Sequence, residues 1–179
     1  HPELIVISFE QNKGKRHAMA EGTRRAKGQI IVYMDSDSLL SSDHSIYYLV
    51  QGFKNPSVGA ISGHTNVLNT DDNMLTKMQE VRYFLAFRVM KAAESVFSLV
   101  TCCSGPLSAY RKKCVMRVLD SWLNQRFLVR RATFGDDRSL TRLILRHHRV
   151  LYDNRATIET VVPSNWNIFF KQQMRWKRS

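Results

Sequence analysis

The sequence contains few of the residues that mark several classes of protein. Only three of its 179 residues are cysteines, two of them adjacent, so neither a disulfide framework nor a Cys/His metal site is indicated and a reducing compartment fits best. Eight glycines and four prolines, beside 44% hydrophobic residues, exclude a disordered chain and indicate one domain with a core. The longest stretches without a charged residue, 55–70 and 95–110, are shorter than a membrane-spanning helix of roughly 20 residues.

Acidic residues are scarce relative to basic ones. Asp and Glu number 15 against 27 Lys and Arg, which gives a net charge of +12 at pH 7. Such a chain attracts anions: a phosphate-bearing substrate, nucleic acid or an anionic membrane surface. An ordinary solvated basic surface explains the charge equally well. Because the sequence has no zinc-finger spacing, single-strand motif or aromatic-basic stripe, we expect no nucleic-acid partner.

Hydrophobic periodicity predicts one α/β domain over residues 1–179. Apolar runs at 4–9 and 30–34 enclose a helical pattern at 15–26, which is the size of a βαβ unit, so we expect a mostly parallel central sheet flanked by helices. Ligands of such sheets bind at the carboxyl ends of the strands. Further helices are predicted at 45–53, 73–96, 112–123, 136–146 and 165–177, and further strands at 58–62, 150–152 and 157–162; residues 108–110 flank a turn at Gly105-Pro106.

Two carboxylates follow the predicted strand 30–34. In an extended segment Asp35 and Asp37 would point to the same side and could hold Mg²⁺ or Mn²⁺ together with substrate phosphates; a polar loop after a strand is the plainer alternative. Lys15 opens the preceding helix. A lysine at a helix N-terminus suits a phosphate, although an ordinary solvated lysine explains it as well.

A second acidic pair, Asp136 and Asp137, follows Gly135 at a predicted helix start. One acid could cap the helix while the other acts as a general base that removes a proton from an attacking hydroxyl. The alternative is that both acids only stabilise the positive end of the helix.

Three side chains near the end of the sequence share one face of the last predicted helix: Gln172, Arg175 and Trp176. A guanidinium can pair with a diphosphate and an indole can stack on a sugar ring; an amphipathic helix with a buried Trp is the alternative. The segment 101–111, which contains Cys102, is a small polar turn that could line the floor of a pocket or simply pack.

In their order along the chain these segments resemble the processive family-2 glycosyltransferases, and most closely the hyaluronan synthases. The match covers most of the chain and depends on six segments. They are residues 12–16 (NKGKR), 35–38 (DSDS), 102–107 (CCSGPL, followed by Tyr110-Arg111), 122–127 (WLNQRF), 134–138 (FGDDR, followed by Leu140-Thr141) and 172–176 (QQMRW).

The resemblance implies a GT-A (Rossmann-like) glycosyltransferase fold that uses a UDP-sugar with Mg²⁺ or Mn²⁺ and extends a glycan. By position, Lys15 and Asp35 would contact UDP and Asp37 would hold the metal. Asp137 would be the general base, supported by Asp136. The acceptor end and the diphosphate would be held by Gln172, Arg175 and Trp176, with Cys102 near the sugar pocket or acceptor end.

The resemblance also implies a larger membrane protein. Residues 1–179 would be a truncated catalytic domain that faces the cytoplasm, with the first nucleotide-binding strand and the transmembrane helices outside it. Its partners would be the UDP-sugar, the growing glycan and the membrane.

Departures from the synthase pattern leave the polymer open. Ser139 stands where the synthases usually have His, Ser108-Ala109 replace a glycine and a larger apolar residue, and Val129 stands where glycine is usual. We expect a β-linked polymer made from UDP-GlcNAc and UDP-GlcA. The alternatives are a chitin or chito-oligosaccharide synthase that uses UDP-GlcNAc alone, a non-catalytic nucleotide-sugar-binding domain, and a basic nucleic-acid-binding module.

Overall fold

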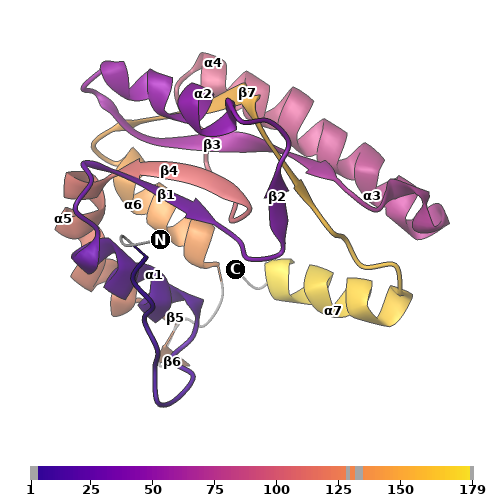
Figure 1. Cartoon of the computed structure of the whole chain (residues 1–179), viewed down its shortest axis with the longest axis horizontal. Coiled ribbons are helices and arrows are strands. Elements are labelled where there is room, and N and C mark those ends of the chain that lie inside the picture. The colour runs from indigo at the N-terminus through magenta and orange to yellow at the C-terminus, as the bar shows by residue number, and fades with distance from the viewer. Residues whose placement is uncertain (1–3, 128–129, 132–134, 178–179) are drawn as a thin grey trace.

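A mixed five-stranded sheet forms the centre of the computed structural model (Figure 1), which describes residues 4–127, 130–131 and 135–177. Val129 and Phe134, used in the comparison with the synthases, lie outside these residues. The order of the strands is β1-β4-β3-β7-β2, and β5 and β6 pair separately. Their bounds are β1 Ile30–Met34, β2 Ser38–Leu40, β3 Val58–Val67, β4 Leu107–Arg111, β5 Arg126–Phe127, β6 Arg130–Arg131 and β7 Arg149–Thr160.

The prediction of an α/β sheet flanked by helices is confirmed, but the expectation that its strands are mostly parallel is wrong. Among the strands of this sheet that the structure describes, only β3 and β7 pair in parallel, whereas β1–β4, β3–β4 and β2–β7 are antiparallel. Since β4 lies between β1 and β3, those two strands run in the same direction without touching. An apolar strand buried on both faces has the same residue pattern in either direction, so its sequence does not encode how it pairs.

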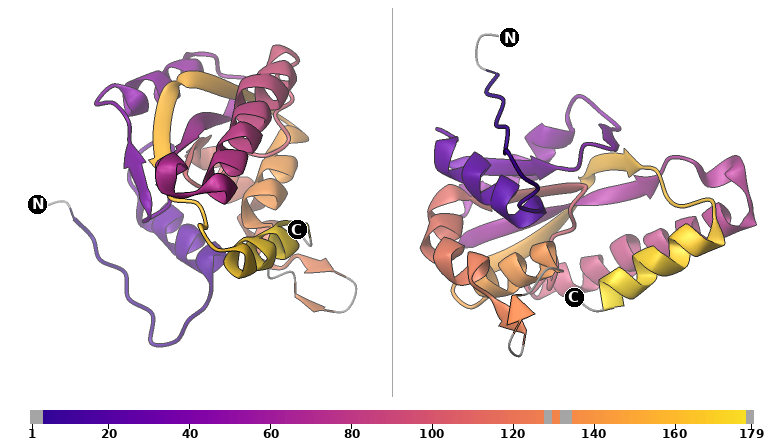
Figure 2. Two further views of the ribbon diagram at one scale, coloured as in Figure 1. Left: turned by 90° about the vertical axis from the view of Figure 1, so that its right-hand side faces the viewer. Right: turned by 90° about the horizontal axis from the view of Figure 1, so that it is seen from below.

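The apolar run at 4–9 forms no strand, contrary to the prediction. Its residues extend away from the folded body (Figure 2), and Leu4 and Val6 are 73% and 79% exposed. A strand needs a neighbour that takes up its backbone hydrogen bonds, and in the described part of the chain no strand pairs with these residues. The expected βαβ unit is therefore reduced to its helix and second strand.

The predicted helices are present, with small differences at their ends. The long pattern at 73–96 is one continuous helical rod whose middle part is π-helical, and the strands expected at 150–152 and 157–162 are a single strand, β7. The helices are α1 Lys15–Arg25, α2 Ser45–Gln51 with the 3₁₀ turn η1 Gly52–Lys54, η2 Thr70–Asp72, α3 Met74–Phe84, the π-helix η3 Leu85–Lys91, α4 Ala92–Val96, α5 Lys112–Leu123, α6 Asp136–Leu145 and α7 Trp166–Lys177.

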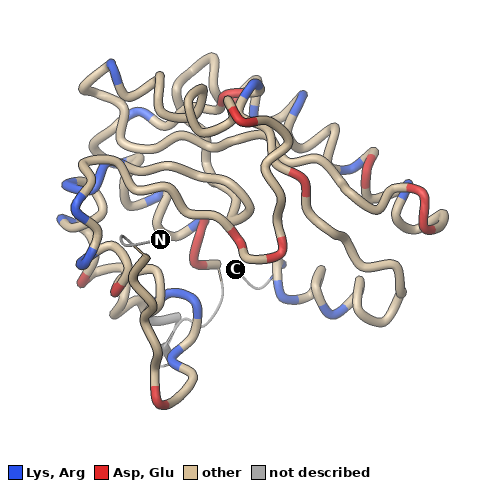
Figure 3. Tube along the Cα trace, in the orientation of Figure 1, with Lys and Arg blue, Asp and Glu red and all other residues tan. Residues whose placement is uncertain are grey.

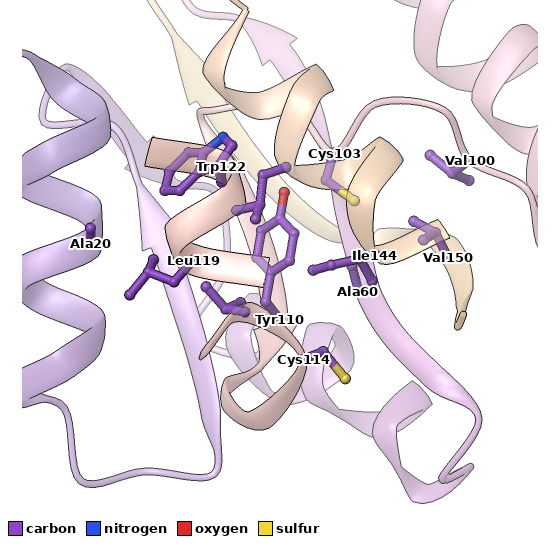
Figure 4. Packing of buried hydrophobic residues seen from close by; sticks show 12 residues of the cluster. Ala20, Ala60, Val100, Cys103, Tyr110, Cys114, Leu119, Trp122, Ile144 and Val150 are labelled. Carbon is purple, nitrogen blue, oxygen red and sulfur yellow. The ribbon is translucent and has the colours of Figure 1, made fainter. Parts of the chain in front are cut away.

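Two apolar clusters hold helices on the two faces of the sheet. On one face α1, α5 and α6 pack around Tyr110 and Trp122, which are 1% and 0% exposed (Figure 4). On the other face Leu49 and Phe53, from α2 and η1, pack on Ile61 and other residues of β3, β4 and β7. The large buried rings fix α5 and α6 against β4, and this fixes the start of α6 relative to the end of β1.

The helical rod α3–η3–α4 and the helix α7 lie side by side (Figure 2). The segment that leads into α7 is fastened to α3: Asn73 Nδ2 donates to Ser164 O at 2.9 Å, and Gln79 Nε2 donates to Pro163 O at 2.7 Å. Asn165 caps α7 by accepting from the N–H of Asn167 at 2.8 Å. Among the residues that the structure describes, no helix has both the length and the apolar character needed to cross a membrane.

Candidate active site

Lys15 joins the start of α1 to the end of β1. Gly14 turns the chain into the helix with φ of 80°, a conformation that favours glycine, and its N–H donates to Asn12 Oδ1 at 2.9 Å. Lys15 Nζ donates to Asp35 Oδ1 at 2.6 Å and lies 3.8 Å from Asp137 Oδ1. Burial lowers the pKa of Lys15, but the carboxylates of Asp137 and Asp35 outweigh burial, so the pKa is raised and the ammonium group stays charged.

The segment from Asp35 to Ser38 is a turn, so the expectation that strand alternation puts both carboxylates on one side is wrong. The N–H of Ser38 donates to Asp35 O at 3.2 Å, because the chain turns here from β1 into β2. Asp35 is half-buried against Lys15, whereas Asp37 is exposed. The two acids are still neighbours in space, since the charges of both act on the Tyr83 hydroxyl of α3, whose pKa burial raises to about 12.

Asp137 lies in the first turn of α6, which begins after Gly135 in the left-handed conformation (φ 75°). The pKa of Asp137 is raised to about 6. Burial is the main cause, and the charges of Asp35 and Asp136 add to it. Lys15 and a hydrogen bond from the backbone of Gly105 act in the opposite direction. A carboxylate with this pKa is ionised at neutral pH and accepts a proton more readily than an ordinary one, as a general base requires.

Gly105 lies where these groups meet, although it was not among the site residues expected from the sequence. A Cβ atom at Gly105 would lie 2.7 Å from Asp35 Oδ2, 2.7 Å from Lys15 Nζ and 2.9 Å from Asp137 Oδ2. The loop before β4 thus brings bare backbone between the acids at the end of β1 and those at the start of α6, which face each other in Figure 3. The signals in the sequence are its place in the segment 102–107 (CCSGPL), which resembles the synthases, and in a polar turn that could line a pocket.

Asp136, the other acid of the pair, points away from this meeting point. Arg16 Nε donates to its Oδ1 at 2.7 Å, so Asp136 forms an ion pair with α1 instead of capping its own helix. The structure gives the two adjacent acids different partners: Asp136 pairs with Arg16, and Asp137 faces Lys15 and Gly105.

Cys102 begins the loop that carries Gly105. Burial raises the pKa of its thiol, and the nearby charge of Asp137 raises it further, while Lys91 and Arg138 lower it. Lys91, from the π-helical segment, donates to the backbone oxygen of Cys102 and so ties the loop to the rod. All three cysteines are free, as predicted.

The three predicted acceptor residues lie on α7. This helix contacts α3, and α3 in turn lies near Asp35 and Asp37. Arg82 donates to Gln173 Oε1, and its guanidinium lies 5.9 Å from the ring of Trp176. The charges of Asp35 and Asp37 act on the hydroxyl of the next residue, Tyr83. Arg175 is exposed, and the buried Oε1 of Gln172 has no hydrogen-bond donor among the described residues. Neither Arg82 nor Tyr83 was found from the sequence, because neither belongs to one of its motifs.

The arrangement has the fold of the GT-A glycosyltransferases. A solved mannosyltransferase from Pyrobaculum calidifontis, in complex with GDP-Man and Mn²⁺, superposes on this chain with a TM-score of 0.64 at 22% identity. The superposition covers 97% of this chain and 44% of the mannosyltransferase chain. At this identity the likeness concerns the fold alone.

Sequence similarity identifies the family to which the chain belongs. The profile described as "Glycosyltransferase like family 2" matches residues 1–179. The chain is 37% identical over 176 residues to a hyaluronan synthase of Streptococcus pyogenes, covering 98% of this chain and 42% of the synthase. It is 36% identical over 177 residues to an N-acetylglucosaminyltransferase of Azorhizobium caulinodans, covering 98% of this chain and 44% of that protein. The chain belongs to glycosyltransferase family 2, and it spans less than half the length of these two relatives.

Proposed function

We propose that this chain catalyses inverting transfer of sugars from UDP-sugar donors to a growing β-linked polysaccharide, as a processive enzyme of the hyaluronan synthase type. The observation that carries the proposal is the convergence of Lys15, Asp35 and Asp137 around the bare backbone of Gly105. A cation, a carboxylate at a strand end and a second carboxylate of raised pKa are the groups needed to bind a diphosphate and to activate a hydroxyl.

Lys15 and Asp35 form the nucleotide end of the proposed site, and Asp37 is its metal ligand. Asp37 is exposed and offers a carboxylate beside Asp35. In the described part of the chain no three His, Cys, Asp or Glu side chains form a metal cage. This fits Mg²⁺ or Mn²⁺, since such ions are held by one or two carboxylates together with substrate phosphates. When bound, the metal would neutralise charge on the departing diphosphate.

Asp137 acts as the general base in this proposal. Its carboxylate takes the proton of an acceptor hydroxyl as that oxygen forms a bond to the anomeric carbon of the donor sugar. The bond from the anomeric carbon to the UDP oxygen breaks, and UDP leaves with the electron pair. Attack opposite the leaving group inverts the anomeric centre. Lys15, 3.8 Å from Asp137, lowers the pKa of that carboxylate and contacts the UDP phosphates.

Helix α7 holds the acceptor. Gln172 is half-buried, and its amide group can exchange hydrogen bonds with a sugar hydroxyl. Arg175 is exposed and can reach a diphosphate, and Trp176 offers a ring for stacking. Cys102 lies at the sugar end, within electrostatic reach of Asp137.

The whole protein is proposed to be a membrane enzyme whose catalytic domain faces the cytoplasm. This follows from the resemblance to hyaluronan synthases and from the length of the relatives, of which this chain matches 42% and 44%. The first nucleotide-binding strand and the transmembrane helices are proposed to lie outside residues 1–179. Because the similarity to an N-acetylglucosaminyltransferase is nearly as high, a chitin or chito-oligosaccharide product is the second candidate.

The two candidates differ in the donors that they need. Membranes containing the intact protein are given labelled UDP-GlcNAc with and without UDP-GlcA, in the presence of Mg²⁺ or Mn²⁺. Polymer that requires both donors supports a hyaluronan product, and polymer from UDP-GlcNAc alone supports the chitin type. If UDP binds but neither donor mixture yields glycan, the chain is a nucleotide-sugar-binding domain and the catalytic proposal is wrong.

A further inference from the structure

Arg16 is a buried cation next to the proposed site, and its contacts are unlike those of a surface arginine. It is 6% exposed although it lies in the first turn of α1. Its Nε donates to Asp136 Oδ1 at 2.7 Å, and its Nη1 donates to the backbone oxygen of Trp122 at 2.8 Å. Its guanidinium carbon lies 5.5 Å from the centre of the Trp122 ring. Three elements, α1, α5 and α6, therefore meet at this one side chain.

The same tryptophan holds the backbone of Asp136. Trp122 is fully buried, and its Nε1 donates to Asp136 O at 3.1 Å and to Ser139 Oγ at 2.9 Å. Ser139 Oγ in turn donates to Asp136 O at 3.1 Å. Both the side chain and the carbonyl group of Asp136 are thus fixed by groups outside the helix backbone. Trp122 and Ser139 donate to the carbonyl oxygen of Asp136 and Arg16 donates to its carboxylate, so these contacts hold Asp136 in place without capping the free N–H groups of the first turn.

We propose that Arg16 is a positioning residue, which acts with Trp122 and Ser139 to fix the first turn of α6 so that Asp137 faces Lys15 and Gly105. The inference rests on the proposed function of Asp137 as the base. Adjacent residues of α1 contact adjacent acids of α6: Lys15 lies beside Asp137, and Arg16 pairs with Asp136. These two contacts fix the start of α1 relative to the start of α6.

A direct role of Arg16 in binding phosphate does not fit the geometry. Its side chain is closed off from solvent, and even its remaining nitrogen, Nη2, is buried and has no acceptor among the described residues. A substrate could reach it only after the contact with Trp122 had opened. Arg16 therefore affects the step in which Asp137 takes a proton, and not the affinity for UDP.

The test compares Arg16→Met with Arg25→Met in the intact protein. Arg25 is the matched control: it lies on the same helix and forms an ion pair of the same 2.7 Å length with Glu21, but it is exposed. Arg16→Met is expected to lower kcat by roughly 10- to 100-fold, since misplacing a catalytic group by about 1 Å has effects of that order, while the Kd for UDP stays within about twofold. Arg16→Lys, which keeps the charge near Asp136, is expected to recover part of kcat, and Arg25→Met is expected to match wild type.

The double variant Arg16→Met/Asp136→Asn covers the case in which Arg16→Met alone fails to fold, since it removes both charges of the pair. Its kcat is expected to fall by the same roughly 10- to 100-fold relative to wild type, because the contact between Arg16 and Asp136 is removed only once. The inference is overturned if folded Arg16 variants keep wild-type kcat, or if they lose UDP affinity while kcat is unchanged. Absence of transfer by the wild-type protein would instead refute the proposed function, so the two failures are distinguishable.

Discussion

Replacing Gly105 by alanine adds a single methyl group at the point where the proposed catalytic groups meet. Its φ angle is not in the positive range that favours glycine, so the backbone accepts alanine. The new Cβ would lie 2.7 Å from Asp35 Oδ2 and Lys15 Nζ and 2.9 Å from Asp137 Oδ2, whereas ordinary contacts begin at 3.4 Å. These atoms must each withdraw by about 0.5–0.7 Å, which side-chain ends can do without unfolding the protein.

The magnitude follows from that displacement. A shift of about 1 Å in a catalytic group can lower the rate by about 100-fold, so we expect Gly105→Ala to reduce kcat by roughly 10- to 100-fold. The free energy of unfolding should not decrease together with kcat. At a position whose backbone angles it can adopt, alanine reduces the conformational entropy of the unfolded chain and so stabilises the protein by about 0.4–1 kcal/mol. Loss of activity in a protein that is as stable as wild type is therefore the expected signature.

The assay measures initial rates of labelled sugar incorporation and thermal unfolding on the same preparations of the intact protein. Gly22→Ala is the control: Gly22 lies within α1, a Cβ there would have no atom within 4 Å, and alanine in a helix interior adds about 1 kcal/mol of stability. Wild-type kcat in Gly105→Ala would refute the reasoning, since three proposed site atoms would then have moved without consequence.

Three further predictions concern the acids of the site. Asp137→Asn should lower transfer by roughly 10²- to 10⁴-fold while UDP affinity, measured by calorimetry, stays nearly unchanged, since a general base contributes to chemistry and not to donor binding. Asp37→Ala should abolish the dependence of UDP affinity on Mn²⁺, because the proposed metal loses its protein ligand. The base must be ionised to act, so kcat/KM should fall as pH decreases through an apparent pKa of about 6, the value that burial gives Asp137.

Each of these predictions has an outcome that contradicts it. If Asp137→Asn lost UDP affinity but kept its turnover, Asp137 would be a residue that binds UDP and not the general base. A Kd for UDP that still responds to Mn²⁺ in Asp37→Ala would mean that another group holds the metal. A rate that stays constant from pH 8 to pH 5 would exclude a base whose pKa lies near 6.

Local pattern alone located most of the elements. The strand 30–34 and the helix 112–123 agree with β1 and α5 residue for residue, because the first is a short apolar run and the second has apolar residues at the helical period. Residues 4–9 have an equally good strand pattern and form no strand, since a strand also needs a neighbour. The pattern at 73–96 predicted the rod α3–η3–α4 but not its exposed side, where Val81 and Val89 are 61% and 51% exposed.

The sequence by itself determined the chemistry of this protein: the types of side chain, their order, and the membership in glycosyltransferase family 2 that they carry. Only the tertiary structure decided which groups each acid contacts. Asp136 and Asp137 are adjacent in the chain, yet one pairs with Arg16 and the other faces Lys15 and Gly105. That division depends on contacts between residues as many as 120 positions apart, which packing of α1, α5 and α6 on one face of the sheet creates and which no local pattern contains.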